Sequence, residues 1–136
     1  NGLAATELDI TQSALTSLID LAHTFSATLI GARNAQSGQD VVKTAAKSAL
    51  ESLNSILNQT HAGKFIFAGI NSDVAPLSDY FSTPASAGKS AVDAAFLAEF
   101  GVAQNSAGAG SITASQMDTF LNGNYAALFG AGQCDA

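Results

Sequence analysis

The feature that most constrains this chain is a long apolar heptad pattern over residues 3–36, which neither Pro nor Gly interrupts before Gly31. Apolar residues with this spacing share one face of an α-helix. At about 1.5 Å per residue the helix is roughly 50 Å long, and its pattern predicts a coiled-coil seam. The two heptad positions hold Leu8, Leu15, Ala22 and Leu29, and Thr11, Leu18, Phe25 and Ala32, with Ile19 widening the stripe.

A second helix is predicted over residues 40–61. The segment 34–38 separates it from the first helix, and we expect Gly38 to take the left-handed conformation that ends a helix. Ser37 or Asp40 can then cap the next helix. A connection this short predicts antiparallel helices. The seam positions of the second helix are Val42, Ala46, Ala49, Leu53, Ile56 and Thr60, with Ala45, Leu50 and Leu57 beside them.

After Gly63 the pattern changes from helical to strand-like, which predicts a short β-hairpin over about residues 63–77. Residues 64–69 favour a strand, and Phe65 and Phe67 are expected on one face because strand side chains alternate. The sequence Asn71-Ser72-Asp73 is typical of a turn. Residues 74–77 can return as an edge strand, in which Pro76 limits pairing.

The remaining sequence predicts a small, mostly helical region beyond a boundary near residues 80–86. A helix is expected from about Ser90 to Phe100, and the Gly- and Ala-rich residues 104–110 are expected to be mobile. Thr113 and Gln116 have the spacing of a capping box. That box should start a short helix with Met117, Phe120 and Leu121 facing inward, which ends at Asn122-Gly123. The predicted fold is mainly α: a helical rod with a β-hairpin over residues 1–80 and a partial outer domain over residues 86–136.

Composition excludes several classes of protein. The formal charge is −6, and only 12% of the residues are charged, which argues against nucleic-acid binding and against an anionic membrane surface. We find no run of about 18 apolar residues, so no membrane-spanning segment is expected. The start of the chain does not resemble a signal peptide. The lone cysteine, Cys134, cannot form an internal disulfide.

Residues that could support catalysis are sparse, and we expect no enzyme, cofactor or metal site. His23 and His61 fall in different elements. We expect His61 at the C-terminus of a helix, where a positively charged side chain interacts favourably with the helix dipole, and this would explain the residue without a function. The turn at residues 71–73 supplies too few oxygen ligands for calcium. No phosphate-binding loop and no serine-hydrolase motif is present in the sequence.

The order of motifs over residues 48–77 resembles the flagellin family, and most closely its hook-associated protein 3 branch of hook–filament junction proteins. In that family a helix ends at a glycine, an aromatic strand with an F-x-G motif follows, and a polar turn leads to V-x-P. Residues 11–22 resemble the rod helix of the family, and residues 112–121 resemble an outer-domain segment. The matching hairpin residues are Phe65, Phe67, Gly69, Asn71, Asp73 and Pro76.

The resemblance implies a structural, secreted subunit of the bacterial flagellum that serves motility by filament assembly. Its partners would be hook-associated proteins, flagellin and copies of itself, and its location would be extracellular after export without a cleavable signal peptide. The family's outermost terminal helices are absent here, so we expect an internal fragment. An alternative is a secreted or surface-exposed module that binds a carbohydrate or receptor.

Both long helices carry more apolar residues than one seam can use. A pair of helices cannot cover so wide a surface, and in the resembled family a returning C-terminal helix covers it. We therefore expect an exposed apolar groove that neighbouring copies can fill. The additional residues are Ile10, Ile19, Leu21 and Ile30 in the first helix and Val41, Leu50 and Leu57 in the second.

Overall fold

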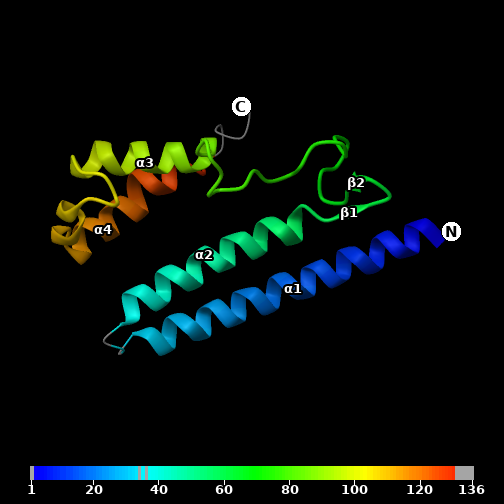
Figure 1. Ribbon diagram of the computed structural model, residues 1–136, viewed down its shortest axis with the longest axis horizontal. Helices are drawn as coiled ribbons and strands as arrows, with labels where there is room; N and C mark the ends of the chain where they lie inside the picture. The colour runs from blue at the N-terminus through cyan, green and yellow to red at the C-terminus, as the bar shows by residue number, and fades with distance from the viewer. Residues whose placement is uncertain (1, 34, 36, 131–136) are drawn as a thin grey trace. The chain divides into compact units, whose positions relative to one another are not determined.

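The computed structural model describes residues 2–33, 35 and 37–130, and the chain divides into two compact units, Asn1–Asp79 and Tyr80–Ala136 (Figure 1). Cys134 lies outside the described residues. The first unit contains α1 (Gly2–Ala32), α2 (Gly38–Leu57), β1 (Thr60–His61) and β2 (Lys64–Phe65). The second contains α3 (Ala87–Phe100), the 3₁₀-helix η1 (Ala107–Ser111), α4 (Ala114–Phe120) and the π-helical segment η2 (Leu121–Tyr125). The structure confirms the prediction of a mainly helical chain and adds a small antiparallel sheet of two strands.

Helices α1 and α2 pack side by side and run in opposite directions (Figure 1). The covered residues of α1 are spaced alternately three and four apart, as in a heptad seam. Ala14 is only 1% exposed and Ala32 is 7% exposed. We call these residues the α1 seam: Thr11, Ala14, Leu18, Leu21, Phe25, Thr28 and Ala32.

The α1 seam differs from the predicted one at every second position. The seam contains Ala14, Leu21 and Thr28 in place of the predicted Leu15, Ala22 and Leu29, each of which is the next residue in the chain. The stripe predicted there is exposed instead: Leu8, Leu15, Ala22 and Leu29. At Ala14 a small residue replaces the predicted Leu15, whereas at Leu21 a larger residue replaces the predicted Ala22.

On α2 the predicted seam positions from Val42 to Ile56 are half-buried, whereas Leu50 is 40% exposed. Gly38 has a different role from the predicted one. It is the first residue of α2 and does not have a positive φ. A Cβ atom at this position would lie 2.2 Å from the backbone oxygen of Ala32, so only glycine fits where the two helices meet.

A β-hairpin is present, but the strands that pair in it are not the predicted ones. β2 pairs with β1, which precedes it, and not with residues 74–77. The turn between them is Ala62-Gly63, with φ values of 51° and 79°. A two-residue turn with two positive φ values is the type I′ turn that fits the twist of a hairpin. Because β2 ends at Phe65, the expected strand alternation does not extend to Phe67.

Residues 66–77 form a loop that folds back on the end of α2. The backbone N–H of Phe65 donates to the carbonyl of Ser72 at 2.8 Å. The Asn58 side chain donates to the carbonyl of Leu77 at 2.8 Å and accepts from its N–H at 3.1 Å. These long-range bonds occupy Asn58 as the C-cap of α2, which explains why the helix ends at Leu57 and not at residue 61.

An aromatic cluster forms the core of the second unit. Phe96 is 6% exposed and Phe120 is 3% exposed, with their ring centroids 5.7 Å apart. Phe100 lies 4.7 Å from Phe96 and 5.4 Å from Phe120, and Tyr125 lies 6.0 Å from Phe120. Edge-to-face and tilted pairs at these distances are favourable beyond their buried area. This cluster joins α3, α4 and η2.

Side-chain caps set the helix starts in the second unit. The predicted capping box is confirmed: the Thr113 hydroxyl accepts from the Gln116 N–H, and the Thr113 N–H donates to the Gln116 side chain. The predicted start of α3 near Ser90 was wrong, because the Ser86 hydroxyl accepts from the N–H of Lys89 and starts the helix at Ala87. Two further expectations fail: η2 continues past Asn122-Gly123, and Leu121 is 45% exposed.

One described helix is long and apolar enough to cross a membrane by length and composition, which corrects the expectation that no such segment exists. It covers Ala4–Ala32, close to the N-terminal end of the given sequence. Core helices of soluble proteins and signal sequences meet the same criterion. Glu7, Asp9 and Asp20 lie within this helix.

We predict that Ala14→Leu lowers the free energy of unfolding by about 1–3 kcal/mol, because the added atoms overfill the contact between α1 and α2. Ala22→Leu is the matched control, since Ala22 is exposed on the same helix. Urea denaturation followed by circular dichroism measures both. Equal effects of the two substitutions would show that Ala14 is not at a tight contact.

We predict that Ala62→Gly stabilises the β1–β2 hairpin by up to about 1 kcal/mol. The positive φ of an L-residue costs about 1–2 kcal/mol, which glycine avoids, and the larger conformational entropy that glycine loses on folding offsets part of this gain. Gly63→Ala should destabilise the same turn for the same reason. Hydrogen exchange of the Lys64 and Phe65 amides measures both effects. Faster exchange in Ala62→Gly would contradict the assigned turn.

Candidate interaction surface

A stripe of exposed apolar side chains runs along α1 beside its seam. Leu8 is 67% exposed, Ile19 58% and Ile30 71%. Leu15 and Leu29 are also exposed and large. We call the following residues the apolar stripe: Leu8, Leu15, Ile19, Ala22, Leu29 and Ile30. At about 100° per residue, the stripe is centred about a quarter turn around the helix from the α1 seam.

The apolar stripe has few charges near it. The charged residues nearest to it lie at its two ends, Glu7 and Asp9 beside Leu8 and Arg33 after Ile30, whereas Asp20 lies about 100° around the helix from Ile19. Eight of the 17 residues between its members are Gln, Thr or Ser. The middle of this surface can therefore be covered by another helix without the cost of burying an unpaired charge.

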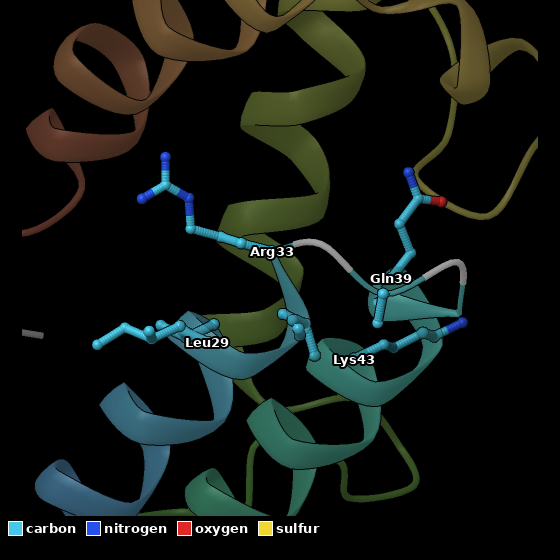
Figure 2. Close-up of a pocket in the computed structure, with 9 residues that line it drawn as sticks. Leu29, Arg33, Gln39 and Lys43 are labelled. Atoms are coloured by element: carbon cyan, nitrogen blue, oxygen red, sulfur yellow. The ribbon is translucent and has the colours of Figure 1, made fainter.

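The apolar stripe ends in an open hollow of about 890 Å³ where α1 and α2 meet (Figure 2). Leu29 of α1, Arg33 directly after α1, and Gln39 and Lys43 of α2 line it, and the charged ends of Arg33 and Lys43 extend to opposite sides. We call this the loop-end hollow. The hollow could not be predicted from the sequence, because Arg33 follows α1 and Lys43 belongs to α2.

The two helices also enclose a smaller groove of about 160 Å³. Its lining combines the apolar side chains of Leu21, Phe25, Ala45 and Ala49 with the hydroxyl groups of Thr24, Thr28, Ser48 and Ser52. The Thr28 hydroxyl donates to the carbonyl of Thr24 at 2.9 Å, so part of its hydrogen-bonding capacity is already used within α1. The apolar stripe, by contrast, has no polar atoms to satisfy.

The hairpin residues of the family motif do not form one site. Phe65 and Phe67 are half-buried, whereas Asn71, Asp73 and Pro76 are exposed. Gly69 has a φ of 59°, which an L-residue would adopt only with strain. The loop also exposes two apolar residues that the sequence analysis did not select: Ile70, at 100%, and Val74, at 65%.

His61 lies in β1 and not at the end of α2, so the helix-terminus explanation for it was wrong. Its Nε2 atom is buried and has no hydrogen-bond partner within the described part of the chain. The residue lines an open hollow of about 430 Å³ together with Glu7, Thr11 and Lys64. His23, by contrast, is exposed on α1.

Two polar groups of the second unit, Tyr80 and Lys89, have shifted pKa values. Burial raises the pKa of the Tyr80 phenol, and the nearby Asp93 carboxylate adds to the increase. The hydrogen bond to Asp93 raises the pKa of the Lys89 ammonium group, and the two side chains form an ion pair one turn apart on α3. Among the described residues, no group of three His, Cys, Asp or Glu side chains is placed to hold a metal ion.

No protein-family model, curated protein or solved structure matches this chain. The resemblance to flagellins therefore depends on the motifs in the sequence. The feature that the structure contributes independently is the apolar stripe on α1.

We predict that the chain self-associates in solution and that Ile19→Lys weakens this association at least about tenfold, because a lysine in the apolar stripe would have to be desolvated in the contact. Ser13→Lys is the matched control, since Ser13 is exposed about 120° around α1 from Ile19. Light scattering at rising concentration measures both. A parent chain that stays monomeric, or equal effects of the two lysines, would contradict the prediction.

Proposed function

We propose that the chain is a structural subunit of the bacterial flagellum, which either joins the hook to the filament or forms the filament. In this proposal α1 and α2 form the helical-hairpin rod of the subunit, and residues 86–136 belong to its outer domain. The subunit acts by packing against its neighbours and not by catalysis. Its partners are hook-associated proteins, flagellin and further copies of the chain.

The apolar stripe is the observation that carries this proposal. Helix α1 has 31 residues, packs one seam against α2 and exposes a second apolar surface. This arrangement is typical of a subunit in a larger assembly. Large exposed apolar patches are uncommon on monomers and mark contact surfaces. The flagellar assignment adds the motif resemblance over residues 48–77 to this structural feature.

The low charge of the chain also supports packing as the function. Surface ion pairs contribute little free energy, and contacts between long helices depend mainly on shape and apolar area. The ion pairs Lys47–Glu51 in α2 and Lys89–Asp93 in α3 each lie within a single helix. The exposed apolar side chains of α1 are therefore available for contacts between subunits.

Secretion follows from the same proposal. A flagellar subunit is exported by the flagellar route without a cleavable signal peptide, and its final location is extracellular. The apolar helix Ala4–Ala32 would then pack in a protein assembly and not in a bilayer.

We predict that an antibody raised against the chain labels the flagella of cells that encode it, either at the hook–filament junction or along the filament. Immunogold electron microscopy measures the position of the label. Serum depleted with the purified chain is the control and should remove the labelling. Label spread over the cell surface, with none on flagella, would refute the flagellar proposal and favour a surface-binding module.

A further inference from the structure

We propose that the loop-end hollow of one copy receives the acidic segment Glu7-Leu8-Asp9 of α1 from the next copy, in a head-to-tail contact. This inference rests on the subunit-packing part of the proposed function. It identifies the partner as a second copy of this chain and the contact as apolar with two flanking ion pairs.

The first observation concerns the hollow. Leu29, Ile30 and Val42 supply its apolar lining, and Arg33 and Lys43 flank it on opposite sides (Figure 2). The sequence has only five basic residues, so this is a concentration of positive charge in an acidic chain. Within the described part of the chain, Arg33 and Lys43 form no ion pair. Asp40, which shares α2 with Lys43, does not line the hollow.

The second observation concerns the other end of α1. Leu8 is 67% exposed and is flanked in sequence by Glu7 and Asp9. Successive helical residues point about 100° apart, so the two carboxylates lie on either side of the leucine. Neither carboxylate forms an ion pair among the described residues, although Lys64 lines the hollow beside Glu7.

The two ends are therefore complementary. One presents a single apolar side chain between two anions, and the other presents an apolar hollow between two cations. Opposite charges at the rim of an apolar contact fix its orientation and exclude wrong partners. A second copy in the same orientation supplies this segment, whereas the stripe-to-stripe contact between copies requires no charge matching.

The contact joins two different surfaces and is heterologous. Each copy keeps one free hollow and one free acidic segment, so the contact propagates as an open chain of subunits. The two surfaces are separated by about 21 residues of α1, which corresponds to about 30 Å along the helix. The middle of the apolar stripe, Leu15, Ile19 and Ala22, lies between them and stays available for lateral packing.

Charge reversal tests the contact on the whole chain. We expect Glu7→Lys/Asp9→Lys and Arg33→Glu/Lys43→Glu each to weaken self-association at least about tenfold, measured by sedimentation velocity over a concentration series. Asp20→Lys is the control, because it reverses a charge on the middle of α1, and it should leave association unchanged. Raising the salt concentration should weaken association of the parent chain.

Mixing the two double variants gives the sharper result. Each variant alone presents like charges at both surfaces, whereas a mixture restores opposite charges at every contact. We expect an equimolar mixture to associate within about threefold of the parent chain, which a folding defect in either variant could not produce. Circular dichroism of each variant alone checks the helix content.

The outcomes separate this inference from the proposed function. If the double variants associate as the parent does, or if their mixture associates no better than each alone, the head-to-tail contact is wrong. Loss of association in Ile19→Lys would still support packing through the apolar stripe in that case. A parent chain that stays monomeric throughout would overturn both forms of packing, and the labelling of flagella is decided separately by microscopy.

Discussion

The close contact between α1 and α2 determines most of what the first unit can do. It depends on small residues: Ala14 is almost completely covered, and Gly38 leaves no room for a side chain next to Ala32. Leu18, Leu21 and Phe25 complete the α1 seam between these small residues. The other large apolar residues of α1 lie on the neighbouring surface of the helix, and the apolar stripe consists of residues that this contact leaves uncovered.

The sequence was sufficient to predict features that depend on local spacing. The helical period gave two long helices, and the Thr113–Gln116 spacing gave a capping box that the structure confirms. The seam register could not be predicted in the same way, because Leu15 and Ala14 are neighbours and both fit a heptad. Hydrophobicity favours Leu15, whereas the distance between the helices selects Ala14. That distance is a property of both helices and is not encoded in either one alone.

The hairpin shows a second limit of reasoning from sequence. Residues 64–69 have high β-propensity, yet β2 ends at Phe65 because its N–H bonds to Ser72 and the chain turns away. Asn58 similarly ends α2 through hydrogen bonds to Leu77, nineteen residues further along the chain. Both boundaries are set by partners that are distant in sequence, and propensity describes only the neighbours. The hollow that Arg33 and Lys43 flank was missed for the same reason.

Low charge gives the few exposed ionic groups of the first unit an unusual importance. On a densely charged surface, two cations beside a hollow would be paired by neighbours and would select no partner. Here Arg33 and Lys43 have no ion pair among the described residues, and the same holds for Glu7 and Asp9 at the other end of α1. Apolar area can supply the strength of a contact without specifying its direction. In a chain with so few charges, the positions of those charges can determine which end of one subunit meets which end of the next.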